Sequence, residues 1–169
     1  MKKTLYLVFR YFLIIILSLN SLYLVYALFT PITSYLSYLA LKTVYNASII
    51  GSTIIINNKS IALIDACIAG SAYFLLALLN LSTPDIKKRF LVLGFEWICF
   101  LAANTLRIVV LSVLFVKESD YFSKAHILSW YFLSALFVIA IWIITIKIFK
   151  IQKIPFYSDS LYLKKLIKK

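Results

Sequence analysis

Long uninterrupted apolar blocks constrain this chain more than any other feature of its sequence. Four blocks are long enough, or nearly so, to cross about 30 Å of hydrocarbon: 5–29, 67–82, 90–116 and 127–149. The chain is 63% hydrophobic, whereas a soluble domain carries about 45–50% apolar residues. Strands cross lipid only as a closed barrel. We therefore expect an all-α polytopic membrane protein, a bundle of about four transmembrane helices in a single domain, 1–169. The second block is short, which predicts a helix that is tilted or partly shielded by protein.

The first block has two interpretations. Lys2 and Lys3 precede it, and Val25-Tyr26-Ala27 near its end resembles a signal-peptide cleavage site. The apolar stretch is, however, much longer than the 7–15 residues of a usual signal-peptide core. A retained helix is the preferred interpretation, and a cleaved signal peptide is the alternative.

The net charge of +12 raises the question of nucleic acid, but the position of the charges argues against such a partner. Basic residues lie mostly at the ends of apolar blocks, where they meet lipid headgroups and set orientation. With a cytoplasmic N-terminus, thirteen basic residues lie inside and four outside. The inner set is Lys2, Lys3, Arg10, Lys87, Lys88, Arg89 and the seven from Lys147 to Lys169; the outer set is Lys42, Lys59, Lys117 and Lys124. We expect a plasma-membrane protein with both termini cytoplasmic and a basic cytoplasmic tail, 150–169.

The outer segment, 30–66, predicts two elements. From Pro31 to Thr43, apolar residues recur at helical spacing with polar residues between them, as in a short interfacial helix. Two Ile-rich runs then flank Asn57-Asn58-Lys59, which predicts a β-hairpin because Asn tolerates the positive φ of tight turns. The hairpin delivers the chain to Cys67. Asn46 and Asn58 each begin an Asn-x-Ser glycosylation pattern, which is short and arises often by chance.

Arg107 is the most informative residue, since a charged side chain among lipid tails normally faces the protein interior or water and has a partner. The alternative is an arginine that reaches the outer headgroups. Asn104 lies three residues earlier on the same helical face. Glu96 extends this polar stripe or, as the preferred interpretation, makes a polar contact between helices.

Cys67 begins the second block at its outer end. A cysteine is more often a small buried apolar residue than a nucleophile. In the first turn of a helix, however, the dipole favours thiolate, and free backbone amides can hold an oxyanion. Gly70 lets another helix or a substrate chain approach closely. Asp65 caps the helix, which is the preferred role, or orients a base.

The remaining candidates are Cys99 and His126. Cys99 lies mid-helix with no cation nearby, which predicts simple packing, and the two cysteines fall on different helices, so we expect no disulfide. His126 is the only histidine and starts the fourth block. A single histidine argues against most zinc sites, and we expect no metal and no cofactor.

The combination decides the interpretation. The topology rests on basic residues at block ends, yet it places Cys67, Arg107 and His126 in the outer parts of three successive helices. A thiol, a cation and a base in one partly dry pocket are the groups needed for acyl transfer by a cysteine nucleophile.

These residues resemble the exosortase/archaeosortase family of membrane-embedded cysteine transpeptidases, over roughly Ile54 to Trp142. The resemblance rests on Ala66-Cys67-x-x-Gly70, on Asn104-x-x-Arg107-Ile108, and on His126 before Trp130. The family commonly has Ser or Thr and then Gly directly after the cysteine, whereas Ile68 and Ala69 stand there in this chain.

The resemblance implies a protease or transpeptidase that cleaves C-terminal tripartite sorting signals of exported proteins at the outer membrane face. Cys67 would attack the scissile carbonyl, Arg107 would steady the thiolate or the oxyanion, and His126 would protonate the leaving amine and activate the acceptor. The implied partners are the sorting-signal helix and a membrane lipid or other acceptor. Two alternatives are a non-enzymatic membrane subunit and a small transporter component, with Arg107 as a structural or anion-binding residue.

Overall fold

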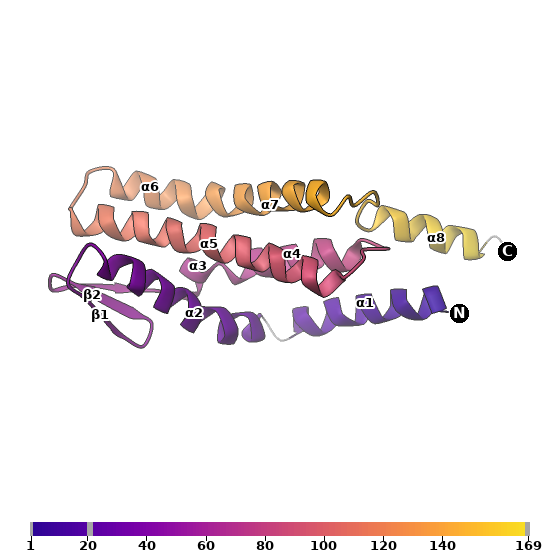
Figure 1. The fold of residues 1–169 in the computed structure, drawn as a ribbon, viewed down its shortest axis with the longest axis horizontal. Helices are drawn as coiled ribbons and strands as arrows, with labels where there is room; N and C mark the ends of the chain where they lie inside the picture. The colour runs from indigo at the N-terminus through magenta and orange to yellow at the C-terminus, as the bar shows by residue number, and fades with distance from the viewer. Residues whose placement is uncertain (1, 20–21, 168–169) are drawn as a thin grey trace.

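The computed structural model describes residues 2–19 and 22–167, and this part of the chain is 73% helical. The helices lie roughly along one long axis (Figure 1). A small sheet lies at one end of this axis, and the first and last helices of the described part of the chain lie at the other (Figure 1). The sheet therefore shares one end of the bundle with the loop 117–121.

Within the described residues, three helical segments are long and apolar enough to cross a membrane: Tyr23–Lys42, Arg89–Val116 and Phe122–Ile148. The first is helix α2 and the second is α5. The third is continuous through α6 (Phe122–Leu128), the π-helix η1 (Ser129–Leu133) and α7 (Ser134–Ile148). These spans support a membrane protein, and the last two agree with blocks 90–116 and 127–149, except that the third span starts at Phe122.

The N-terminal part of the chain differs from the expectation. Block 5–29 is not one helix: α1 spans Lys2–Leu19, and α2 begins at Tyr23 after Leu22, whose φ of 63° is incompatible with a continuing right-handed helix. Nor is there a separate interfacial helix starting at Pro31. Pro31 lies inside α2. The proline removes one backbone hydrogen bond of the helix, and packing against neighbouring helices compensates for this loss.

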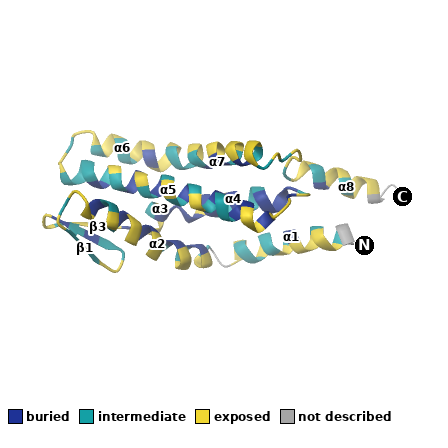
Figure 2. Ribbon diagram, viewed as in Figure 1, coloured by how far each residue is buried: buried dark blue, intermediate teal, exposed yellow. Residues whose placement is uncertain are grey.

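The block 67–82 is also divided. A single turn, α3 (Asp65–Ile68), is followed by Ala69 with φ 58°, and α4 then runs from Gly70 to Ser82. Thirteen residues of helix rise about 20 Å, less than the hydrocarbon thickness of about 30 Å. A fourth transmembrane helix is therefore not confirmed, although α4 is the most enclosed helix of the bundle (Figure 2).

The expected hairpin is confirmed and is part of a larger sheet. Strands β1 (Ala47–Ile50), β2 (Thr53–Ile56) and β3 (Lys59–Ala62) pair antiparallel in the order β1-β2-β3. Asn57 and Asn58 form the predicted turn with φ values of 48° and 64°. The additional strand, β1, follows from Gly51, whose φ of 61° closes a second tight turn.

Aromatic packing joins α2, α4 and α5 at the centre of the bundle. Tyr73 of α4 is fully buried, and its ring stacks on Phe29 of α2 with 3.8 Å between centroids. Phe100 of α5 contacts the same ring edge-on at 4.7 Å. Such pairs add about 0.5–1.5 kcal/mol each to the burial itself, so this cluster fixes the three helices against each other.

The basic tail contains a helix that the sequence did not predict, α8 (Tyr157–Ile167). It packs beside α1, where Arg10 forms a buried ion pair with Asp159. Tyr11 Oη also donates to Asp159, over 3.2 Å. Arg10 is therefore part of the packing between α1 and α8 as well as one of the basic residues at this end.

Candidate active site

A cavity of about 200 Å³ lies between β3, the α3 turn and the helices α5, α6 and η1. Cys67, Arg107 and His126, which the sequence placed on three different elements, all line it. Most of the other lining side chains are apolar. They include Leu63, Ile108, Leu111, Phe115, Phe122 and Trp130. The cavity therefore combines a thiol, an imidazole and a guanidinium with a largely apolar wall.

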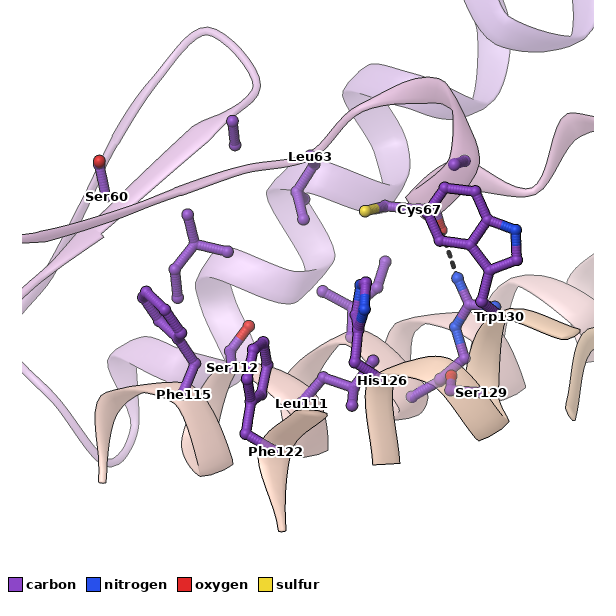
Figure 3. Close-up of a pocket in the computed structure, with 15 residues that line it drawn as sticks. Ser60, Leu63, Cys67, Leu111, Ser112, Phe115, Phe122, His126, Ser129 and Trp130 are labelled. Carbon is purple, nitrogen blue, oxygen red and sulfur yellow. Dashed lines mark hydrogen bonds between the residues drawn. The ribbon is translucent and has the colours of Figure 1, made fainter. Parts of the chain in front are cut away.

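The Cys67 side chain projects from the α3 turn toward the cavity (Figure 3). Its backbone amide donates to Ile64 O over 2.8 Å, and the next amide, of Ile68, donates to the same oxygen over 3.3 Å. These two amides are engaged inside the turn and are not free to hold an oxyanion, so the prediction of an oxyanion site stays with the other amides of the turn. The turn positions the thiol and does not supply those donors.

Arg107 and Asn104 of α5 both donate hydrogen bonds to the backbone at Cys67. Arg107 Nη2 donates to Cys67 O over 3.0 Å, and Asn104 Nδ2 donates to Cys67 O over 3.0 Å and to Ile68 O over 3.2 Å. The second terminal nitrogen, Nη1, donates to Ser134 Oγ over 2.6 Å. Arg107 is only 8% exposed, so the interpretation as an arginine reaching the headgroups is wrong. The polar stripe of α5 fixes the α3 turn to α7.

His126 lies between two aromatic residues one turn away on either side. Its ring is 5.6 Å from Phe122 at an interplanar angle of 27°, and 6.0 Å from Trp130 at 73°. The ring points into the same cavity as the Cys67 thiol (Figure 3). This packing holds the imidazole at the cavity wall while leaving it half-buried.

The π-helix η1 begins three residues after His126 and was not predicted. Its first residue, Ser129, lines the cavity and is 5% exposed. Ser129 Oγ and Arg107 Nε are buried polar atoms without a hydrogen-bond partner in the described part of the chain. Single-turn π-bulges occur frequently at functional sites. The only signal in the sequence for Ser129 and Ser134 was a hydroxyl on an otherwise apolar helix.

Gly70 and Asp65, the supporting candidates, take other places. A Cβ on Gly70 would lie 2.6 Å from Cζ of Tyr26, so the glycine admits a ring from α2. Asp65 is exposed and begins α3, but it does not line the cavity. The cap position is Ile64, with no side-chain capping bond. The structure therefore gives Asp65 neither the capping role nor contact with His126.

Glu96 and Cys99 lie outside the cavity. Glu96 is fully buried and accepts from Asn80 Nδ2 over 3.2 Å, which makes it the interhelical contact that we preferred. Arg89 extends this network by donating to Asn80 O and, over 2.6 Å, to Thr83 O. Both cysteines are free thiols.

Comparison of the chain with protein-family models, with curated proteins and with solved structures gives no match.

Proposed function

We propose that this protein is a membrane-embedded cysteine transpeptidase or protease, similar in mechanism to the exosortase/archaeosortase family. The observation that supports the proposal most is that Cys67 and His126 face one cavity, although they come from separate elements. A thiol and an imidazole that face each other across a partly dry cavity are the minimum for nucleophilic catalysis with a general base.

The proposed reaction has two halves. In the first, His126 takes the Cys67 proton, and the thiolate attacks the scissile carbonyl to form a tetrahedral oxyanion. Collapse of this intermediate breaks the C–N bond, and the imidazolium returns the proton to the leaving amine. The product is a thioester on Cys67. In the second half, His126 takes a proton from the acceptor, which attacks the thioester and releases the thiolate.

Arg107 is a positioning residue in this proposal and a source of positive charge. Its two terminal nitrogens bond Cys67 O and Ser134 Oγ, so it holds the nucleophile's backbone at a fixed depth. A buried guanidinium at the cavity wall also stabilises the negative charge that develops on sulfur and on the carbonyl oxygen, because the surrounding dielectric is low. The positive charge favours the anionic intermediates over the neutral reactants.

The proposed substrate is the C-terminal tripartite sorting signal of an exported protein: a short motif, a transmembrane helix and a basic cluster. Thirteen basic residues favour a cytoplasmic position for both termini, so the cavity would face outside. The substrate helix would pack laterally against the bundle while its basic cluster stays in the cytoplasm. Water or a membrane lipid would be the acceptor.

The test is the processing of an exported reporter protein that carries such a tail, in cells that express the protein. The proposal predicts loss of processing in Cys67→Ala, Cys67→Ser and His126→Ala at normal membrane levels. Cys99→Ala is the matched control, since this thiol lies outside the cavity and should leave processing intact. Wild-type processing in Cys67→Ser would refute the proposal.

One observation favours a second candidate, a non-enzymatic membrane subunit. The terminal nitrogens of Arg107 are engaged with the protein itself, as expected of a structural clamp. A structural subunit would keep its activity in Cys67→Ser, whereas a cysteine peptidase would not.

A further inference from the structure

β3 is an edge strand with one free side. In the order β1-β2-β3, β2 is its only strand neighbour within the described residues. Antiparallel pairs alternate between residues that exchange backbone bonds and residues that do not. Leu63 N donates to Ser52 O over 3.0 Å, which sets the phase of this alternation. The bonded residues on the β3 side are therefore Lys59, Ile61 and Leu63, and the N–H and C=O groups of Ser60 and Ala62 point away from β2.

The free side of β3 borders the cavity. Four consecutive residues, 60–63, line it, whereas a strand that turned one face to a cavity would present only alternate residues. The cavity therefore meets the strand along its edge. Figure 3 shows the strand with Ser60 and Leu63 running along one side of the cavity toward Cys67, with His126 on the helical side.

An ion pair holds the start of this edge opposite the helices. Lys59 Nζ donates to Glu118 Oε1 over 2.6 Å and to Val116 O, at the end of α5, over 3.1 Å. The bond from Lys59 also keeps the pKa of the Glu118 carboxyl below its usual range. The edge and the helical wall are thus joined at the far end of the cavity, and Cys67 lies at the other end.

We propose that the free edge of β3 is a peptide-binding site: an extended peptide adds as a fourth antiparallel or parallel strand, pairs with Ser60 and Ala62, and so brings its scissile carbonyl to Cys67. This inference rests on the proposed function and names how its substrate binds. Strand addition of this kind gives affinity through main-chain bonds and specificity through pockets for alternate side chains.

The cavity lining defines the chemical class of the peptide. Leu111, Phe115, Phe122 and Trp130 offer an apolar wall, so the side chain that points from the peptide into the cavity is apolar and uncharged. The buried hydroxyl of Ser129, without a partner among the described residues, is available to a peptide carbonyl or amide. A cationic side chain there would lose its hydration with no acidic residue in the lining to compensate it.

The experiment traps a peptide on Cys67 and measures amide exchange on β3. In the full-length Cys99→Ala variant, Cys67 is the only thiol. The ¹⁵N-labelled protein in detergent micelles is treated with acetyl-Thr-Val-Thr-Val-Cys-amide, or with acetyl-Cys-Thr-Val-Thr-Val-amide, each activated as a mixed disulfide with 5-thio-2-nitrobenzoate. The Cys67 thiolate attacks the peptide sulfur and releases coloured 5-thio-2-nitrobenzoate, which quantifies loading. Cysteamine, activated in the same way, gives a control adduct without a peptide backbone.

We expect at least one peptide to slow exchange at the Ser60 and Ala62 amides by about tenfold relative to the cysteamine adduct, as one added hydrogen bond each would do. The amides of Ile61 and Leu63 already bond β2 and should not change. Only every second amide of the added peptide would point toward β3. N-methylation of these amides should remove the protection, whereas N-methylation of the other amides should leave it unchanged. Unchanged exchange at Ser60 and Ala62 with both peptides would overturn the inference.

This readout needs no catalysis, so it separates the two proposals. Protection of β3 together with unprocessed reporter tails would retain the peptide site and reject the transpeptidase. Processing that depends on Cys67, with no protection of β3, would do the reverse.

Discussion

Arg107 Nη2 donates to the backbone carbonyl of Cys67 over 3.0 Å. The sequence predicted that Arg107 lies near the Cys67 thiol. In the structure, Arg107 bonds the backbone of Cys67. Because Nη1 bonds Ser134 Oγ as well, the planar guanidinium joins the α3 turn to α7. An ammonium has neither this geometry nor two nitrogens at a fixed spacing.

Replacement of Arg107 by Lys should therefore lower processing of the reporter tail at least about tenfold and lower thermal stability in detergent. The variant removes the Arg107 donor of Ser134 Oγ or one of the two donors of Cys67 O, and loss of a buried hydrogen bond of this kind costs about 1–3 kcal/mol. Reporter processing and the unfolding temperature of the purified variant measure the two effects. Ser134→Ala is the matched control: it removes one of the two bonds and should cost about 1 kcal/mol. Wild-type stability and processing in Arg107→Lys would contradict the clamp.

Gly70→Ala should destabilise the protein by about 1–3 kcal/mol, because overpacking forces side chains and backbone to shift. The added Cβ would lie 2.6 Å from the Tyr26 ring. Tyr26→Ala in the same chain should recover most of the loss. Gly94→Ala is the control, since a Cβ there meets nothing within 4 Å and alanine is favoured in a helix. Equal unfolding temperatures for the two glycine variants would show that the contact of Tyr26 with Gly70 is not close.

Cys99→Ala should keep full processing and cost less than about 1.5 kcal/mol, since it trims one sulfur from a half-buried position. The measurement is reporter processing normalised to the amount of protein in the membrane. Lost processing at a normal protein level would mean that Cys99, and not Cys67, is the reactive thiol.

Fusions of a topology reporter should place Arg89 and Lys169 in the cytoplasm and Asp120 outside. The prediction follows from the thirteen basic residues on one side of the apolar blocks. Fusions of alkaline phosphatase and of a fluorescent protein at the three positions measure the side of the membrane on which each position lies. The two reporters are controls for one another. An external Lys169 would place Cys67 and His126 on the cytoplasmic side and contradict cleavage at the outer face.

The elements that the sequence predicted well are those in which one local signal dominates. Block 90–116 coincides with α5 to within one residue, because length and hydrophobicity leave a span no alternative. The Asn57-Asn58 turn was predicted because Asn tolerates positive φ, and both residues adopt it. The convergence of Cys67, Arg107 and His126 on one cavity followed from topology alone.

The breaks in helices could not be predicted, because they depend on tertiary packing. Leu22 and Ala69 adopt positive φ although neither residue type favours it. Pro31, a usual helix breaker, lies inside α2. The bonds of Arg107 to Cys67 O and Ser134 Oγ could not be predicted either. A sequence shows that a buried cation needs partners, but it does not show which acceptors it contacts.

Capture of a thioester on Cys67 would show whether this thiol is the nucleophile. The purified Cys99→Ala protein is mixed in micelles with a synthetic tripartite tail, quenched in acid, and analysed by mass spectrometry after digestion. We expect the acyl part of the tail on the peptide that contains Cys67, released by hydroxylamine and absent from Cys67→Ala. Its rate of formation should fall at least a hundredfold, the usual order for loss of a general base, in His126→Ala. A processed tail with no acyl adduct on Cys67, or an adduct that forms equally well in His126→Ala, would contradict the account.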